Sequence, residues 1–165
     1  MTNHAPEALL KTKKLVEEIR YCMMTTLTPE GAMTSRPMTV LRMDDQGNLW
    51  FFADEDSEQT VAFDMDDSVN LAFACPEKSK YLSIVGTAKV LKDRAKIDEL
   101  WNAMAAAWFP EGKDDPAICL IQVHPHSAEY WESTNSKVVQ LLGVAKAILG
   151  GKRFDTGVEH GKVNC

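Results

Sequence analysis

The sequence predicts an α+β fold, made mainly of antiparallel β-strands that form a barrel of six or seven strands with flanking helices. Two observations lead to this prediction. Runs rich in β-branched and aromatic residues alternate with turn residues, as in hairpins, and apolar residues at helical spacing occur between them. With 165 residues and 45% hydrophobic content, the chain fits one compact domain. We divide it into an N-terminal helix (1–20), a barrel (21–132) and a C-terminal helix and tail (136–165).

Seven runs are expected to be strands. Pro29 and Gly31 suit a tight turn between the first two, and Asp-Asp-Gln-Gly at 44–47 can close a hairpin before the third. In the fourth, large residues alternate with small ones, which predicts one buried face. Gly86 in the fifth indicates a bulge or a close backbone approach, and Pro125 is expected at a break or an edge between the last two. The expected strands are 22–28, 33–43, 48–54, 69–75, 81–91, 117–123 and 128–132.

The expected helices have apolar residues three or four positions apart. Residues 56–57, Asp-Ser, can supply the N-cap of the second helix. In the third, Trp101, Met104 and Trp108 are expected in the core, although Trp108 and Phe109 could instead border a cofactor. The expected helices are 6–19, 57–66, 93–108 and 136–149, and a polar tail without periodicity follows at 152–165.

Composition and charge exclude several classes of function. The formal charge is −6 and the pI is near 5.2, and no dense basic stripe is present to neutralise phosphates, which argues against nucleic-acid binding. Lys11, Lys13 and Lys14 form a short basic run that we expect on the solvated face of the first helix. Neither an apolar stretch that could span a bilayer nor a signal peptide is found, so no membrane contact and a cytoplasmic location are expected.

The cysteines and histidines give no sign of a metal site. Cys22, Cys75, Cys119 and Cys165 are widely spaced with no C-x-x-C pair, and we expect the first three to be buried in strands and the last to be accessible. His124 and His126 flank a proline rather than lying one helical turn apart, so we expect no metal. His160 is expected to make a tail contact rather than to act as a base.

The stretch 33–61 is the best candidate for a binding site. A strand end next to the exposed N–H groups of a helix start can hold a phosphate. Arg36 and Arg42 share one face of the expected strand 33–43 by its two-residue period. The alternative is an ordinary hairpin with two surface arginines.

These residues also carry a family resemblance. Ser-Arg-Pro-Met at 35–38 and Leu-Trp-Phe-Phe-Ala-Asp at 49–54, with Ser57 three residues on, resemble the flavin site of pyridoxamine 5'-phosphate oxidase-like split barrels. Motifs at 69–73, 86–88 and 128–131 follow in the family's order. The closing Glu-His-Gly-Lys-Val at 159–163 is similar to the general stress protein 26 branch. The resemblance implies a split β-barrel that binds FMN and forms a homodimer with flavin at the subunit interface.

The resemblance also implies roles for particular residues. Arg36 would hold the flavin phosphate with the Ser57 hydroxyl beside it, and the backbone at 36–38 and 52–53 would face the flavin ring. Trp131 would approach the ring from the other subunit. The implied cofactor-binding set is Ser35, Arg36, Pro37, Met38, Phe52, Ala53, Asp54, Ser57, Gln59 and Trp131, and no catalytic residue is assigned.

Two departures from the family pattern bear on function. Where relatives often carry a basic residue after the helix-start serine, this chain has Glu58 and Gln59, which weakens the attraction for a phosphate. Arg42 could reach the same anion instead, FAD could replace FMN, or the site could be empty. The arginine-x-histidine element that follows the tryptophan in vitamin B6 oxidases is missing here, which disfavours true pyridoxamine 5'-phosphate oxidase activity.

Three functional hypotheses therefore stand. The first is a stress-related flavin-dependent oxidoreductase that acts on an unknown small molecule. The second is a non-catalytic flavin-binding or sensor protein. The third is a barrel that has lost flavin and binds a protein partner.

Overall fold

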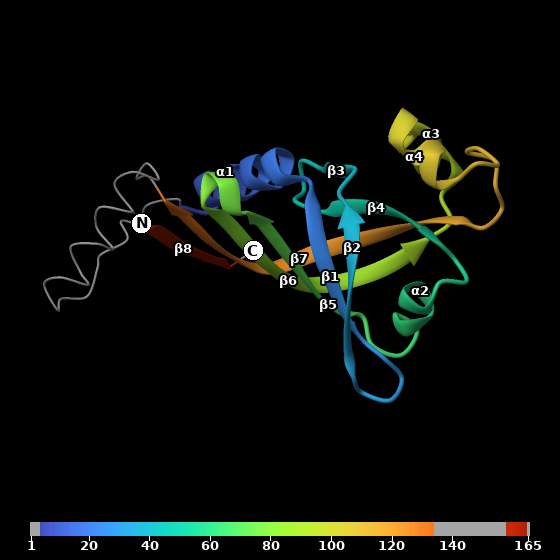
Figure 1. The fold of residues 1–165 in the computed structure, drawn as a ribbon, viewed down its shortest axis with the longest axis horizontal. Coiled ribbons are helices and arrows are strands. Elements are labelled where there is room, and N and C mark those ends of the chain that lie inside the picture. Colours follow the sequence, from blue (N-terminus) through green and yellow to red (C-terminus); the bar gives the residue numbers. More distant parts are fainter. Residues whose placement is uncertain (1–3, 134–157, 165) are drawn as a thin grey trace, which may run out of the picture.

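Eight strands form one antiparallel sheet in the computed structural model, which describes residues 4–133 and 158–164 (Figure 1). The strand order is β2-β1-β5-β6-β7-β4-β3, and β8 pairs with β7. The strands are β1 (Tyr21–Leu27), β2 (Met33–Thr39), β3 (Arg42–Met43), β4 (Leu49–Asp54), β5 (Ser68–Cys75), β6 (Lys80–Leu91), β7 (Ile118–Ser133) and β8 (Val158–Asn164). The predicted α+β split β-barrel is confirmed, with seven strands on the main path and β8 beside it.

The helices lie at the margins of this sheet. They are α1 (His4–Ile19), α2 (Glu58–Ala62), α3 (Arg94–Leu100) and α4 (Ala103–Trp108), and a short 3-10 helix spans Pro76–Lys78. Helix α1 packs against the sheet, whereas α3 and α4 lie at the end remote from β8 (Figure 1). In the part of the chain that the structure describes, no helix is both long enough and apolar enough to cross a membrane.

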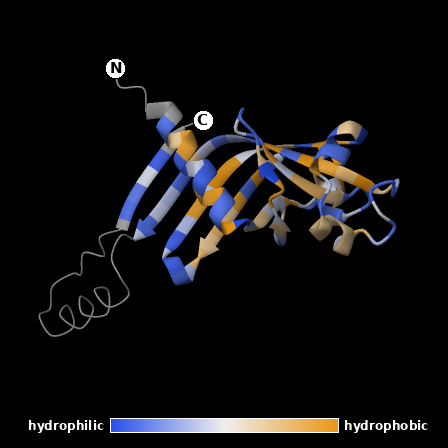
Figure 2. Cartoon of the chain, turned by 90° about the horizontal axis from the view of Figure 1, so that it is seen from above, coloured by the Kyte–Doolittle hydropathy of each residue, from blue (hydrophilic) through white to orange (hydrophobic). Residues whose placement is uncertain are grey.

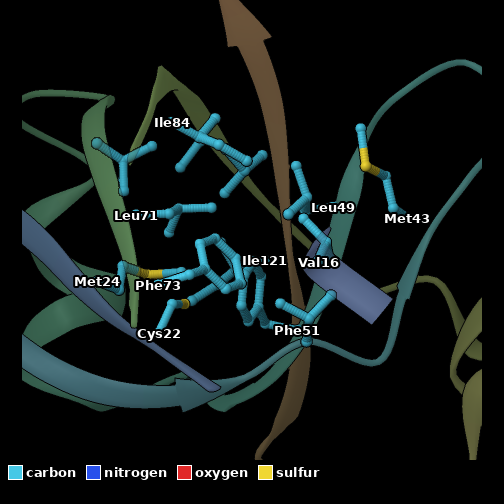
Figure 3. Close-up of a cluster of buried hydrophobic side chains, with 14 of the residues drawn as sticks. Val16, Cys22, Met24, Met43, Leu49, Phe51, Leu71, Phe73, Ile84 and Ile121 are labelled. Carbon is cyan, nitrogen blue, oxygen red and sulfur yellow. The ribbon is translucent and has the colours of Figure 1, made fainter. Parts of the chain in front are cut away.

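The core follows from the two-residue period of the strands. In β5, Val69, Leu71 and Phe73 are buried while the small residues between them face outward, as their alternation predicts. Figure 3 shows Leu71 and Phe73 among side chains from β1, β4, β6 and β7, with Val16 of α1 packed beside Leu49. Hydropathic colouring shows orange apolar segments concentrated along the middle strands (Figure 2). Burial of a large side chain such as Phe51 contributes about 2–3 kcal/mol.

The longest strand, β7, organises the sheet. One edge pairs with β6, and the other edge is shared by β4, which pairs with its first half, and β8, which pairs with its second half. No break occurs at Pro125, because β7 runs through it, but the predicted alternative of an edge agrees with the pairing, since β4 pairs with β7 as far as Val123 and β8 pairs from Ser127. The register between β6 and β7 shifts at Val85/Gly86, and this bulge accommodates the proline opposite Gly86. The expected bulge at Gly86 is confirmed.

Other predicted boundaries require correction. The expected strand 33–43 is divided into β2 and β3 around residues 40–41, and the expected helix 93–108 into α3 and α4. Asn102 causes the second division, because its side chain accepts hydrogen bonds of 3.0 Å from the N–H groups of Met104 and Ala105 and so caps a new helix. Helix α2 is shorter than the predicted 57–66, but its predicted cap, Ser57, is confirmed.

The C-terminal part of the chain also differs from expectation. The expected helix 136–149 lies outside the described residues. The tail shows no periodicity in its sequence, yet 158–164 forms strand β8, with Gly161 opposite Tyr130. An edge strand that is exposed on its faces needs no apolar alternation, which explains why its sequence shows none.

The basic run on α1 is expected to be solvated, but two of its lysines form ion pairs with other parts of the fold. Lys11 forms an ion pair with Glu132 of β7, and Lys13 pairs with Asp45 at 3.0 Å. Lys80 also binds Glu132, at 2.9 Å. The hydrogen bonds from Lys11 and Lys80 lower the pKa of the Glu132 carboxyl. The Lys11 and Lys13 ion pairs fasten α1 to β7 and to the β3–β4 turn, whereas the pair of Lys80 with Glu132 joins β6 to β7.

The predicted hairpin turn at 44–47 is confirmed and is held by one carboxylate. Gly47 adopts the left-handed conformation that this turn needs, with φ of 88°. Asp44 accepts hydrogen bonds from the N–H groups of Gln46 and Asn48, from the Asn48 side chain and, at 2.9 Å, from the Trp50 indole. Burial of Asp44 alone would raise its pKa, but these donors outweigh burial and lower it.

We expect Asp44→Ala to lower the free energy of unfolding by about 2 kcal/mol, because several donors lose their acceptor. Since the folded-state pKa is depressed, this contribution is present above about pH 4 and is lost as the pH falls through the folded-state pKa. Urea unfolding of both proteins at pH 7 and at pH 3 measures this. The difference between them should shrink at pH 3, and an equal difference at both values would contradict the role of the charged carboxylate.

Candidate functional site

An apolar pocket of about 460 Å³ lies between β2, β4 and α4. Its wall combines the end of β2 with the face of β4 and the two aromatic residues that close α4. The size is within the range of small-molecule sites. We call it the apolar pocket; its lining residues are Arg20, Pro37, Met38, Thr39, Val40, Leu41, Phe52, Asn102, Ala103, Met104, Ala105, Trp108 and Phe109.

Phe52 forms the floor of the apolar pocket. Its ring meets Trp101 and Phe109 edge-on, with centroids 5.7 Å and 6.1 Å apart. Such T-shaped contacts stabilise by about 0.5–1.5 kcal/mol beyond burial and fix the ring orientation. Trp108 was predicted to lie in the core, but its side chain is 75% exposed. The alternative expectation, that Trp108 and Phe109 border a ligand site, agrees with their place in this wall.

A second, polar pocket of about 330 Å³ contains Arg36. Arg36 lies on β2, and its Nη2 forms an ion pair with the Glu58 carboxylate at the start of α2. The Arg36 side chain is 35% exposed and that of Glu58 is 89% exposed. We call this the arginine pocket; it is lined by Thr28, Pro29, Glu30, Thr34, Arg36, Glu58 and Ala62. Arg36 is therefore held where it can bind an anion, and a carboxylate of the same chain binds it.

Arg36 and Arg42 do not share a strand face, contrary to the sequence prediction. The division of 33–43 places Arg42 on β3, where it forms an ion pair with Glu99 of α3. Glu99 also binds Lys96, at 2.9 Å. The expectation that Arg42 could reach the same anion as Arg36 has no support in this geometry.

The remaining polar residues of the predicted site serve mainly in local structure. The Ser57 hydroxyl accepts from the N–H of Thr60 at 3.2 Å as the N-cap of α2. Asp54 accepts from the N–H of Asp56 at 2.8 Å, which forms the turn before that cap. Ser35 shares a hydrogen bond of 2.7 Å with the Thr25 hydroxyl across the β1–β2 hairpin.

Gln59 and Ala53 face the interior. Gln59 is 5% exposed, and its amide contacts the sulfur of Met24 on β1. Ala53 is 8% exposed, and its carbonyl accepts from the Cys119 thiol at 3.4 Å. Neither side chain opens into the two pockets. Contact between either of these residues and a ligand would therefore have to involve its backbone atoms.

Trp131 lies apart from the other predicted site residues within one chain. It stacks on His160 of β8, with centroids 5.2 Å apart and planes at 13°. The Nε2 atom of His160 lies 3.5 Å from Glu129. The expected tail contact of His160 is thus confirmed, and it involves the tryptophan itself.

The cysteines resemble core residues rather than reactive groups. Burial raises the pKa of Cys22 to about 12 and that of Cys119 to about 11. Cys75 is partly buried and Cys165 lies outside the described residues. Within 4–133 and 158–164, no group of three or more His, Cys, Asp or Glu side chains could hold a metal ion.

The structure brings Pro37, Met38 and Phe52 into one pocket and Arg36 into the next. It also adds residues that the sequence interpretation missed, chiefly Arg20, Val40, Leu41 and the start of α4. Arg20 adopts a positive φ of 64°, which ends α1 and turns the chain into β1. The only sequence signal for these missed lining residues is the apolar Val-Leu pair at 40–41, which continues the strand motif toward the turn.

Comparisons with known proteins identify the family and agree with the fold. The family model described as "pyridoxamine 5'-phosphate oxidase like" matches residues 7–155. The chain is 28% identical to protein bli-3 of Neurospora crassa over 143 residues, which cover 81% of this chain and 68% of that protein. It resembles a solved structure named general stress protein 26 from Jannaschia sp. CCS1, with a TM-score of 0.74, 25% identity and coverage of 97% and 99% of the two chains. A general stress FMN/FAD binding protein from Xanthomonas citri gives a TM-score of 0.69 with 28% identity, covering 79% of this chain and 92% of that one.

Proposed function

Because the chain belongs to the pyridoxamine 5'-phosphate oxidase-like family, we propose that it binds FMN or FAD and acts as a flavin-dependent oxidoreductase on a small molecule. This proposal rests mainly on one observation, which is that a cationic residue and residues of an apolar wall follow one another along β2. Arg36 lines the arginine pocket, and the next two residues line the apolar pocket. A flavin mononucleotide needs both, a donor for its phosphate and an apolar surface for its ring.

The residues present fit such a ligand. The ion pair of Arg36 with the Glu58 carboxylate supports a role for this guanidinium in holding an anion. Pro37, Met38 and Phe52 supply apolar contact for a ring, and the backbone of β2 offers polar groups for its edge. A bound flavin supplies hydride or electron transfer. The protein's part is to bind the ring, orient it and exclude water from one side.

The proposal includes a homodimer. Several large apolar side chains on the strands are exposed in the single chain, among them Tyr21 (61%), Met23 (42%), Tyr81 (42%) and Val85 (49%). Tyr81 lies opposite Trp131 in the β6–β7 register, so this surface continues to the tryptophan. A second copy packed there would cover the apolar surface and bring Trp131 toward the partner's flavin.

The experiment is a visible absorbance and fluorescence titration of the dialysed protein with FMN and then FAD, followed by anaerobic addition of NADH or NADPH. Saturable binding and bleaching by a nicotinamide are expected. Bound flavin that no nicotinamide reduces would instead favour a non-catalytic flavin-binding or sensor protein. A protein that stays colourless with both flavins would favour the third hypothesis, a barrel that binds a protein partner.

The second hypothesis has one observation in its favour. Within 4–133 and 158–164, Arg20 is the only titratable side chain that lines the apolar pocket. The described part of the chain therefore places no carboxylate, imidazole or amine there for a substrate that needs proton transfer. Hydride transfer through the flavin alone needs no such acid or base, so this observation counts only against reactions that require proton transfer from the protein.

We expect Trp108→Ala to weaken flavin binding about fivefold, because an aromatic contact contributes about 1 kcal/mol. Its melting temperature should stay unchanged, since the side chain is 75% exposed. The matched control is Met65→Ala, because Met65 is also exposed, at 71%, and lines neither pocket named here. Equal flavin affinities for the two variants would remove Trp108 from the binding wall.

A further inference from the structure

We propose that Glu58 is a resident counter-anion of Arg36 that a ligand phosphate must displace, and that it thereby selects among flavins by the charge of their phosphate. This inference rests on the proposed flavin function and concerns the same site. It starts from the ion pair between Arg36 Nη2 and Glu58 Oε2, which joins β2 to the first residue of α2.

The charges that line the arginine pocket determine how strongly Glu58 competes with a ligand phosphate for Arg36. Among the described residues that line it, Arg36 is the only cation, whereas Glu30 and Glu58 both contribute carboxylates. Thr28 and Thr34 add hydroxyl groups, which can donate to an anion but carry no charge. Its described lining residues therefore carry one more negative than positive charge. A phosphate that enters it meets a guanidinium already neutralised by Glu58.

The exchange requires little rearrangement. Glu58 is 89% exposed, so its carboxylate loses little hydration in the ion pair and regains full hydration when it turns away. Helix α2 does not depend on this side chain, because Ser57 and its bond to Thr60 form the cap. Arg36 is more enclosed, at 35% exposure, and stays in place to receive the incoming anion. Glu58 can therefore act as a displaceable anion on a fixed cation.

Discrimination follows from where each flavin carries its charge. The terminal phosphate of FMN bears a charge of about −1.5 to −2 at neutral pH. Each phosphate of the FAD diphosphate bears about one, and riboflavin bears none. Repulsion by the displaced Glu58 scales with that local charge. Glu58 should therefore weaken FMN binding most, FAD binding less and riboflavin binding not at all.

The test compares the unmodified protein with Glu58→Gln, which keeps the shape of the side chain and removes its charge. Fluorescence titrations with riboflavin, FMN and FAD are run at low ionic strength and neutral pH. We expect Glu58→Gln to lower the Kd of FMN about three- to tenfold, that of FAD by a smaller factor and that of riboflavin by less than about twofold. An unchanged FMN Kd, or equal gains for FMN and riboflavin, would overturn the proposal.

Glu30→Gln is the matched control. Glu30 lines the same pocket and is exposed, but the structure pairs Arg36 with Glu58. The gain in FMN affinity should be clearly smaller than for Glu58→Gln. Equal gains would mean that net charge alone acts, and the ion pair with Arg36 would lose its proposed role.

A second readout separates this inference from the flavin function. Inorganic phosphate should raise the melting temperature of Glu58→Gln more than that of the unmodified protein, and the double variant Arg36→Ala/Glu58→Gln should lose this gain. If none of the proteins binds flavin but this pattern holds, the flavin function fails while the counter-anion role of Glu58 stands. If none binds flavin and phosphate protects Glu58→Gln no better than the unmodified protein, both fail.

Discussion

Gly86→Ala is expected to lower the free energy of unfolding by about 3 kcal/mol, at the upper end for overpacking of a core position. A Cβ atom at Gly86 would lie 2.3 Å from the carbonyl oxygen of His124 and 3.0 Å from its carbon. Both are backbone atoms of β7, so relief requires β6 and β7 to separate at their bulge. Chemical denaturation monitored by tryptophan fluorescence measures the change.

Gly161→Ala is the matched control for this effect. There the added Cβ would lie 2.4 Å from the ring of Tyr130, which is the far end of a side chain. The ring can turn aside, with loss of its 3.1 Å hydrogen bond to Glu159, so a smaller loss of about 1 kcal/mol is expected. Equal losses for the two variants would show that close approach to backbone is not what makes Gly86 necessary.

Arg36→Ala is expected to weaken FMN binding by about 1–3 kcal/mol, which corresponds to a rise in Kd of roughly five- to 150-fold. The variant removes the only cation that the described residues supply to the arginine pocket and leaves Glu30 and Glu58 facing the phosphate. Riboflavin, which lacks the phosphate, should bind almost as before. The measurement is the same fluorescence titration with both ligands.

Arg42→Ala provides the control with a matched side chain. Arg42 also forms an ion pair with a glutamate, Glu99, but lies on β3 and outside both pockets. Its FMN affinity should stay within about twofold of the unmodified protein. An equal loss for both arginines would restore the interpretation that the two reach one anion, and an unchanged titration for Arg36→Ala would exclude Arg36 from the phosphate site.

Much of the fold was predictable because it depends on neighbours in the sequence. The turn residues Pro29 and Gly47 and the cap Ser57 act within a few positions of themselves, so their motifs identify the hairpins and the start of α2. Alternation in β5 likewise fixed its buried face. Gly86 was identifiable because an isolated glycine in a long apolar strand weakens it unless another backbone lies close.

Errors arose where a distant partner decides the local structure. Pro125 continues β7 because the bulge against β6 accommodates a residue without an N–H donor. Strand β8 forms from a polar segment because the edge of β7 offers free backbone groups. Asn102 was overlooked as a cap because the apolar spacing of 97–108 continues across it. Trp108 remains exposed since its helix is short and faces a pocket.

The sequence by itself determined the strand and turn pattern, the family and the polar and apolar residues of β2 and β4, because these depend on residue chemistry and order. Only the tertiary structure decided which of them meet. It separated Arg42 from Arg36, buried Gln59 against Met24 and brought α4 against Phe52. In the sequence, Glu58 stands out only because relatives often carry a basic residue at that position. The tertiary structure makes Glu58 the ion-pair partner of Arg36, because a helix start and a strand 22 residues earlier come into contact only in the folded chain.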